Sequence, residues 1–596
     1  LEWLPEKLGV PFPYEKYFQI GVPWIGGAME NISLTTWDDR FLLDDALESE
    51  ERQLLDVINL HEMAHTWFGD LIICRDYAHA WLKESWATYM ETCWLEHDLG
   101  QDAKQHDLWM SAQNYFKECE TRYVRPIVTR TFDSSWDMYD HHLYPGGAWR
   151  LQMLRQQLGD EVFWSAVRQY VDHYAGELVE TDDFRRTLEV VSGRSLAQFF
   201  DEWIHAPGFP ILEGRFRFDA ATHTGTFELA QKQKNTKRGV GLFHLEVDIA
   251  WWVDGERREQ RVAFDGASLR FVVDMPAAPD RVRIDPHLGL LHQLRLDLPD
   301  GMWRAQLEQD DAWGRMQAAR VLVATGRRQN VAAVQAAFER EKFWGVRSEI
   351  AAALGDAANE ASFEALLTLC AGHKEPQSLA SVFRAASNYR DPRLVPVLVE
   401  RLRIGMPPRA TEDALDALGA QREDATAEVL IQHAQRRERS EFGAVGAVRA
   451  MAASRHRALH RWLVENAPPG TLPDRVRAEV CAALGTALRG ASDDERPPLI
   501  EALEARLRDT IFRVRVAAAQ ALCTGRSRGS LDKLRAYQVA LPDQERIRFQ
   551  RQLDTLRRSD RPDRGDDRLE KAERTIRALE SRLEKLEAAK QPDPKS

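Results

Sequence analysis

The sequence predicts a multidomain, mainly α-helical protein in which an α+β domain precedes a small β-sandwich, an α-solenoid and a short C-terminal helix. Three observations lead to this fold class. A chain of 596 residues is too long for a single hydrophobic core. Residues 210–298 show the period-two alternation of strands, and residues 299–560 contain Ala-rich helical segments that recur along the chain.

Residues 1–209 are expected to form the first domain. They mix strand-like and helical patterns and contain all of the candidate catalytic side chains. The sequence starts abruptly at Leu1, in what we expect to be the middle of a domain. We therefore expect a further N-terminal part to precede it.

Residues 210–298 are expected to form a β-sandwich of about seven short strands. The alternation of apolar side chains is clearest at Phe243, Leu245, Val247 and Ile249. Asp254-Gly255 then predicts a tight hairpin turn, after which Val262 and Phe264 resume the pattern. This section is too small for a separate enzyme, so we interpret it as a structural spacer.

Residues 299–560 are predicted to form the solenoid. Similar Ala-rich segments begin at Trp313, Trp344, Arg475 and Arg513, and weaker copies lie near Ser378, Ala410 and Ala444. An Ala-rich helix with one apolar face, repeated at an interval of about thirty to thirty-eight residues, is typical of an α-solenoid. The pattern resembles HEAT-type repeats.

Residues 561–596 are predicted to be a linker and a tail helix. Apolar side chains follow a heptad spacing at Leu569, Ala572, Ile576, Leu579, Leu583 and Leu586. The seam is shorter than the three to four heptads that identify a coiled coil. Two interpretations stay open: self-association through this helix, or a solvated helix that ends the solenoid.

Composition excludes several classes of protein. The balance of 80 basic and 93 acidic residues gives a net charge of −13, which does not support nucleic-acid binding. No apolar run approaches the ~18 residues that a membrane span needs. The six cysteines are scattered without a C-x-x-C spacing and indicate free thiols, although one oxidised pair in the first domain stays open. We therefore expect a cytoplasmic protein.

The stretch His61-Glu62-Met63-Ala64-His65 points to a metal. Residues four apart on a helix share a face, so both imidazoles can reach one cation. The glutamate after the first histidine suits a base that activates water, which is the arrangement of a zinc metallopeptidase. We predict one zinc ion per chain, with Glu62 as the general base.

Two histidines leave a catalytic zinc ion one protein ligand short. Eighteen residues separate His65 from Glu84, enough to end one helix and bring a second alongside, so we predict Glu84 as the third ligand. Glu91 lies two turns further along the same helical face. We expect it to accept a hydrogen bond from a ligating histidine, with a surface carboxylate as the alternative.

Three further segments carry recognisable motifs: Gly26-Gly27-Ala28-Met29-Glu30-Asn31, Tyr144-Pro145-Gly146-Gly147-Ala148, and Trp203-Ile204 with Pro207-Gly208-Phe209-Pro210. Together with the histidine motif, and in this order, they resemble the aminopeptidase N family of gluzincin metallopeptidases. The first resembles that family's exopeptidase motif, the second its catalytic-tyrosine segment and the third the close of its catalytic domain. The resemblance extends over residues 3–298.

The resemblance implies a thermolysin-like α+β catalytic domain that removes the first residue from peptides with a free amino terminus. It implies that Tyr144 stabilises the oxyanion, with Tyr139 as the competing candidate. Gly27, Ala28, Met29 and Glu30 are expected to bind substrate. The small residues let a peptide backbone approach, and the Glu30 carboxylate can bind the α-ammonium group.

Three positions depart from the family pattern. Lys83 stands where the family usually has asparagine, Ser85 where it has glycine, and Gly146 where lysine is common. None of them removes a ligand, so they concern the side-chain pocket and the rate rather than the reaction class.

Two other functions stay open. A peptidase-like scaffold could bind partners through the solenoid without catalysis, although the retained ligands and base favour an enzyme. Epoxide hydrolysis, found in the family's leukotriene hydrolase branch, uses the same zinc site.

Overall fold

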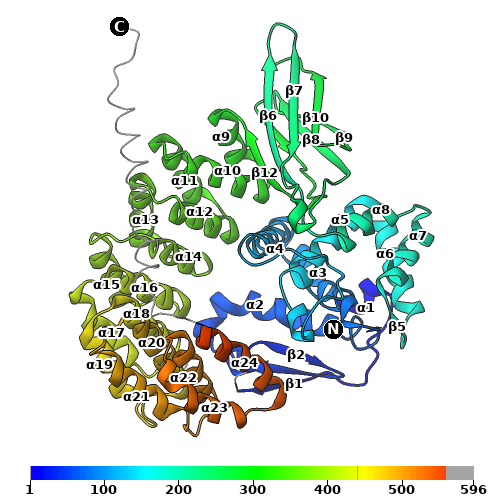
Figure 1. Cartoon of the computed structure of the whole chain (residues 1–596). Coiled ribbons are helices and arrows are strands. Elements are labelled where there is room, and N and C mark those ends of the chain that lie inside the picture. Colours follow the sequence, from blue (N-terminus) through cyan, green and yellow to red (C-terminus); the bar gives the residue numbers. More distant parts are fainter. Residues whose placement is uncertain (1, 24, 439, 559–596) are drawn as a thin grey trace, which may run out of the picture. The chain divides into compact units, whose positions relative to one another are not determined.

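A computed structural model describes residues 2–23, 25–438 and 440–558 (Figure 1). The chain is mostly helical, with several small sheets, and divides into two compact units, Leu1–Ala385 and Ala386–Ser596. This boundary lies inside residues 299–560, so the domain boundaries predicted from the sequence remain predictions. The heptad tail at residues 569–586 lies outside the described residues.

The first 205 residues contain the helices and short strands that carry the candidate site. In chain order, the first of these elements are α1 (Trp3–Leu8), β1 (Phe18–Val22), β2 (Ala28–Asn31), β3 (Leu34–Asp38), η1 (Asp39–Phe41), α2 (Asp45–Ala64), β4 (Ile73–Cys74), η2 (Tyr77–His79) and α3 (Trp81–Asp98). They are followed by α4 (Gln101–Thr121), η3 (Ser135–Met138), η4 (His142–Gly146), α5 (Gly147–Leu158), α6 (Asp160–His173), β5 (Leu178–Val179), α7 (Thr181–Ser192), α8 (Ala197–Phe200) and η5 (Asp201–His205).

Helices α2 and α3 pack against each other and hold the site between them. Helix α2 begins at a favourable cap, because the Asp44 carboxylate accepts hydrogen bonds from the backbone N–H groups of Ala46 and Leu47. The two helices contribute to an aromatic core in which the rings of Phe68 and Trp86 stack with centroids 4.6 Å apart. Burying each such side chain stabilises the fold by roughly 1.5–3 kcal/mol, so this core fixes the helices beneath the polar site.

A three-stranded sheet with the order β1-β3-β2 lies beside α2. Strand β3 pairs in parallel with β1 and antiparallel with β2, which places Glu30 opposite Thr35. Strand β2 is therefore an edge strand among the described strands. An edge strand presents backbone groups that can pair with another extended chain.

Residues 211–297 form two sheets, with the orders β10-β7-β6-β12 and β11-β8-β9. The seven strands are β6 (Ile211–Asp219), β7 (Thr224–Gln231), β8 (Leu245–Val253), β9 (Glu256–Phe264), β10 (Ser268–Asp274), β11 (Arg281–Ile284) and β12 (Gln293–Asp297). Asp254 and Gly255 join β8 to β9 with φ values of 51° and 80°, which is the backbone of a tight hairpin turn. The rings of Phe227 and Trp251 connect the two sheets at a centroid distance of 6.4 Å.

Helices fill the rest of the described chain. The first unit continues with α9 (Asp300–Gln309), α10 (Ala312–Ala324), α11 (Arg328–Arg340), α12 (Trp344–Asp356) and α13 (Glu360–Gly372), and the boundary falls at the last residue of α14 (Pro376–Ala386). The second unit contains α15 (Leu394–Ile404), α16 (Pro408–Gln421), η7 (Asp424–Thr426), α17 (Ala427–Ala434), α18 (Phe442–Ser454), α19 (Arg457–Asn466), α20 (Asp474–Gly490), α21 (Arg496–Arg506), α22 (Phe512–Thr524), η8 (Arg528–Ser530), α23 (Leu531–Val539) and α24 (Asp543–Arg558).

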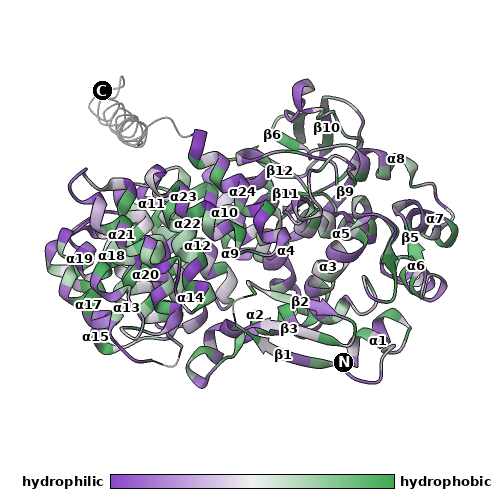
Figure 2. Ribbon diagram, turned by 60° about the horizontal axis from the view of Figure 1, so that its bottom comes forward, coloured by the Kyte–Doolittle hydropathy of each residue, from purple (hydrophilic) through white to green (hydrophobic). Residues whose placement is uncertain are grey.

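Alternate helices of the second unit pack side by side: α16 against α18, α18 against α20, and α20 against α22. Figure 2 shows hydrophobic and hydrophilic residues mixed along these helices, as expected of helices with one buried face. No helix of the described residues is both long and apolar enough to span a membrane. All six cysteines lie in described residues and are free thiols, so the oxidised pair left open from the sequence is absent.

The helix–helix contacts depend on a glycine that recurs after leucine. A Cβ added to Gly419 would lie 2.7 Å from Ala450 Cβ, and one added to Gly485 would lie 2.8 Å from Ala521 Cβ. Gly355 has the same relation to Ala385, at 2.9 Å. Because these neighbours are backbone and Cβ atoms, they cannot rotate away, and only glycine permits this approach.

We expect Gly485→Ala to destabilise the second unit by about 1–3 kcal/mol, since its new methyl group overlaps α22. Gly490→Ala, in the same helix, is the matched control, because nothing lies within 4 Å of a Cβ there. Thermal unfolding together with hydrogen exchange in α20 and α22 measures both effects. Equal stability of the two variants would contradict the close-contact explanation.

Candidate metal centre

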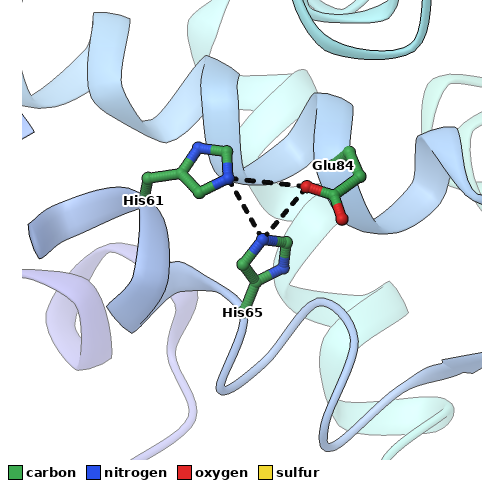
Figure 3. Close-up of side chains that lie close together, drawn as sticks. All are labelled: His61, His65 and Glu84. Carbon is green, nitrogen blue, oxygen red and sulfur yellow. Dashed lines mark hydrogen bonds and ion pairs between the residues drawn. The ribbon is translucent and has the colours of Figure 1, made fainter. Parts of the chain in front are cut away.

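Helices α2 and α3 bring His61, His65 and Glu84 together, as Figure 3 shows. His61 lies in the last turn of α2, His65 caps that helix, and Glu84 lies in the first turn of α3. The Nε2 atoms of the two histidines are 3.1 Å apart. Glu84 Oε2 lies 3.5 Å from the first of them and 3.2 Å from the second.

These three donor atoms fit a zinc ion. Zinc–nitrogen and zinc–oxygen bonds of about 2.0–2.1 Å, at tetrahedral angles, separate neighbouring ligand atoms by about 3.3 Å. The three separations in this structure, 3.1, 3.2 and 3.5 Å, are close to that value. Two imidazoles and one carboxylate are also a donor set that zinc accepts in catalytic sites, where a fourth position stays open.

Each histidine is oriented by its other ring nitrogen. His61 Nδ1 lies 2.5 Å from Glu91 Oε1, and His65 Nδ1 lies 3.0 Å from the carbonyl oxygen of Phe68. Carboxylate and carbonyl oxygens accept these hydrogen bonds, so both Nδ1 atoms donate; when the rings are neutral, each Nε2 atom then has a lone pair for a cation. The hydrogen bond that the sequence predicts between Glu91 and a histidine of the motif is present. The Phe68 carbonyl was not expected, because a backbone acceptor leaves no signal in residue types.

The centre is strongly charged despite its burial. Burial alone raises the pKa of Glu84, but His65, His61 and Lys83 together hold it well below its ordinary value. Burial alone lowers the pKa of His61, and the hydrogen bonds with Glu84 and Glu91 outweigh that and raise it. Both shifts mean that positive charge is favoured beside the Glu84 carboxylate, which is the condition that a bound cation satisfies.

Glu62 lies on α2 beside the ligands and is only 7% exposed. Its Oε2 atom is buried and has no hydrogen-bond partner among the described residues. Burial raises the pKa of Glu62 to about 7, against a lowering by His61 and His65. A carboxylate with a raised pKa and an unpaired oxygen is suited to accepting and returning a proton near neutral pH.

Tyr144 lies beside the centre in η4, a short π-helix. Its ring centroid is 5.9 Å from that of His61, and burial raises its pKa well above the ordinary value. The phenol therefore stays protonated and can donate a hydrogen bond. Tyr139 lies beside it at a centroid distance of 6.3 Å, so both candidate tyrosines remain close to the centre.

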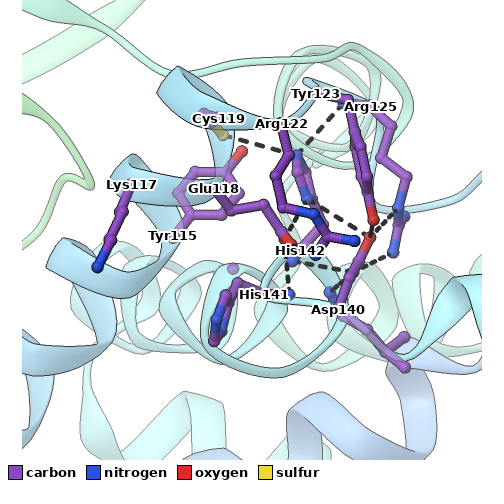
Figure 4. A network of polar contacts seen from close by, with 12 residues as sticks. Tyr115, Lys117, Glu118, Cys119, Arg122, Tyr123, Arg125, Asp140, His141 and His142 are labelled. Atoms are coloured by element: carbon purple, nitrogen blue, oxygen red, sulfur yellow. Dashed lines mark hydrogen bonds and ion pairs between the residues drawn. The ribbon is translucent and has the colours of Figure 1, made fainter. Parts of the chain in front are cut away.

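A buried network fixes the turn that carries Tyr144 (Figure 4). Asp140 Oδ1 accepts hydrogen bonds from the backbone N–H groups of His142 and Leu143, at 3.0 and 2.9 Å. The Arg125 guanidinium donates to both oxygens of the same carboxylate: Nη2 to Oδ1 at 2.6 Å and Nε to Oδ2 at 2.8 Å. Glu118 accepts from the ring of His142 at 3.0 Å. The network thus sets the backbone immediately before the tyrosine.

Glu118, Asp140 and His142 lie close enough together to suggest a second metal site. Their oxygens already accept from arginines, because Arg125 pairs with Asp140 and Arg122 pairs with Glu118 at 2.5 Å. Burial also lowers the pKa of His142. These contacts neutralise the carboxylates from within the protein, so we interpret the cluster as structural.

Ser85 connects the metal helix to the tyrosine turn. Its hydroxyl donates to the carbonyl oxygen of Leu143 at 2.5 Å. A Cβ added to Gly147, at the start of α5, would lie 1.9 Å from Ser85 Oγ. The serine, one of the departures from the family pattern, therefore occupies space that only a glycine at position 147 leaves free.

The expected substrate-binding segment lies at the edge strand. Gly27 precedes β2, whose residues include Ala28, Met29 and Glu30. Nothing among the described residues lies within 4 Å of a Cβ added to Gly26 or Gly27, so open space borders the strand. The Glu30 carboxylate forms an ion pair with Lys83, a contact that the sequence did not predict. Residues fifty-three positions apart meet there, and no local pattern encodes such a pair.

Known proteins that are similar to this chain include a family domain and several aminopeptidases. Residues 1–203 match the Peptidase family M1 domain. The chain is 29% identical over 239 residues to aminopeptidase N of Streptomyces lividans, an alignment that covers 39% of this chain and 28% of that protein. It is 28% identical over 290 residues to a probable aminopeptidase 1 of Sulfurisphaera tokodaii, covering 48% and 36%.

A third relative is aminopeptidase M1-A of Oryza sativa subsp. japonica, which is 25% identical over 288 residues. That alignment covers 45% of this chain and 30% of the rice protein. The chain therefore spans only 28–36% of the length of these three relatives.

We expect Gly147→Ala to destabilise the first unit by about 1–3 kcal/mol, because its methyl group collides with Ser85. Adding Ser85→Gly should remove that cost, since the nearest remaining side-chain atom is then Trp81 Cβ at 3.7 Å. Thermal unfolding of both single variants and the double variant gives the coupling energy. Additive losses would show that the contact does not limit position 147.

Proposed function

We propose that the protein is a zinc-dependent aminopeptidase. It belongs to peptidase family M1 through residues 1–203. Its substrates would be peptides with a free amino terminus, cut at the first peptide bond. The observation that carries this proposal is the convergence of His61 Nε2, His65 Nε2 and Glu84 Oε2 beside the buried carboxylate of Glu62.

The ligands would be His61, His65 and Glu84, with Glu91 and the Phe68 carbonyl holding the histidine rings. A bound zinc ion supplies Lewis-acid chemistry, acidifying the attacking water and polarising the peptide carbonyl. Glu62 takes the proton of the water as general base. It then returns that proton to the leaving amine as general acid.

Tyr144 would stabilise the oxyanion that forms when the carbonyl is attacked. Its raised pKa keeps the proton on the phenol, so the side chain can donate a hydrogen bond to the oxyanion. The fixed backbone before it, anchored by Asp140, supports this role because catalysis by hydrogen bonding needs a donor that is already in place.

Glu30 would determine where the cut is made. Its carboxylate is 13% exposed on the edge strand and acts electrostatically on both Glu62 and His65. A carboxylate in this position can bind the α-ammonium group of a peptide whose backbone pairs with β2. With that end fixed, the first peptide bond is the one that reaches the ligands.

The finer features of the architecture belong to the same proposal. We propose a thermolysin-like α+β catalytic domain, a β-sandwich over β6 to β12, and HEAT-like packing of the helices that follow. The cytoplasmic location and self-association through residues 569–586 also remain proposals. The intact donor set and base favour catalysis over a scaffold role.

Glu62→Gln should keep bound zinc but lose turnover by about 100-fold or more, because it removes the base and no ligand. His65→Ala should instead lose most of the zinc, since it removes one of three protein ligands. Metal analysis and peptide hydrolysis, measured side by side, separate the two effects. Full zinc content in the second variant would remove His65 from the ligand set.

Peptides with a free amino terminus should be cut about 10-fold faster or more than their N-acetylated forms, because acetylation removes the charge that Glu30 binds. Glu30→Ala should lose both this discrimination and most of the activity. The assay compares initial rates on matched peptide pairs. Equal rates on both forms by the unchanged protein would show that it is not an aminopeptidase.

A further inference from the structure

Lys83 lies between two carboxylates of the candidate site. It is the third residue of α3, directly before Glu84, and its ammonium group pairs with Glu30 Oε1. The same Nζ atom lies 3.3 Å from Glu84 Oε1, the oxygen that does not face the histidines. The ammonium group therefore bridges the substrate strand and a metal ligand.

The backbone around Lys83 leaves room for this conformation. A Cβ added to Gly69 would lie 3.0 Å from Lys83 Cγ and 3.2 Å from Cδ. Gly69 also has a backbone φ angle of 136°, which residues other than glycine rarely adopt. The aliphatic stem thus passes over a glycine and directs the charge toward Glu30.

The bridge is accessible from the site. The side chains of Lys83 and Glu30 are 23% and 13% exposed, whereas that of Glu84 is 3% exposed. A ligand can therefore reach Glu30, while Glu84 is covered. Lys83 has a flexible stem, so it can withdraw from Glu30 without moving α3.

The group that Lys83 places against Glu30 is a primary ammonium, the same chemical group as the amino terminus of a peptide. Resting on the proposed function, we propose that Lys83 is an internal occupant of the amino-terminus site and that a substrate must displace it from Glu30. Lys83 is thereby a specificity-determining residue, because it weakens the preference for a free α-ammonium group over a neutral amino terminus.

Competition between Lys83 and a substrate α-ammonium group for Glu30 predicts which ligands a substitution of Lys83 affects. A substrate with a free α-ammonium group gains its contact with Glu30 only by breaking the internal pair, whereas an N-acetylated ligand leaves that pair intact. Removing the lysine charge should therefore favour the free amine selectively. An alternative role, in which Lys83 only balances the charge of Glu84, would alter zinc content and leave the two kinds of ligand equally affected.

The test uses the full zinc-loaded chain and two small probes, L-leucinamide and N-acetyl-L-leucinamide, with binding measured by calorimetry. In Lys83→Met we expect leucinamide to bind about 5-fold more tightly or better, with unchanged affinity for the acetylated probe. Lys83→Arg, which keeps the charge, should bind both probes as the unchanged protein does. Lys117→Met is the matched control, because it removes an exposed lysine charge on a different helix, α4.

In the kinetic assay, Lys83→Met should lower KM for peptides with free amino termini more than it changes kcat, because Lys83 does not touch the reacting bond. Should this variant fail to fold, Lys83→Gln carries the same expectation. Unchanged selectivity between the two probes, with normal zinc content, would overturn the role of Lys83. Failure of the unchanged protein to cut any peptide with a free amino terminus would instead overturn the proposed function.

Discussion

The site depends on one constraint: three donor atoms from two helices must point at one centre before any cation arrives. His61, His65 and Glu84 meet this condition because each is held from a second side. The aromatic core beneath α2 and α3 prevents the helices from sliding, since close packing of large rings allows few alternative arrangements. Packing therefore sets the distances, and hydrogen bonds set the directions of the lone pairs.

The same arrangement gathers negative charge in one place. Glu30, Glu62, Glu84 and Glu91 lie around the two histidines, and Lys83 is the cation that pairs with two of them. Carboxylates that are buried without enough positive charge raise the free energy of the folded state. A divalent cation bound at His61, His65 and Glu84 would relieve this repulsion and would thereby stabilise the first unit.

The sequence was informative where function follows short, fixed spacing. His61, His65 and Glu84 could be brought together from helix geometry and one inter-helix interval, and the hairpin at Asp254-Gly255 from local turn chemistry. The Lys83–Glu30 pair and the Ser85–Gly147 contact could not, because each joins elements whose approach depends on the whole tertiary fold. The division of the chain into two units after Ala385 could not be predicted from the sequence either, because the Ala-rich pattern continues across that position.

Three consecutive residues near the start of α3 connect the parts of the candidate site. Lys83 contacts Glu30 on β2, Glu84 faces the histidines, and the Ser85 hydroxyl donates to the carbonyl oxygen of Leu143, directly before Tyr144. Successive side chains on a helix are about 100° apart, so three of them span more than half of its circumference. This short segment can therefore fix Glu30, the candidate ligand Glu84 and the turn that carries Tyr144 relative to one another. Two of these three residues, Lys83 and Ser85, are among the three departures from the family pattern, and both contact a neighbouring element of the candidate site.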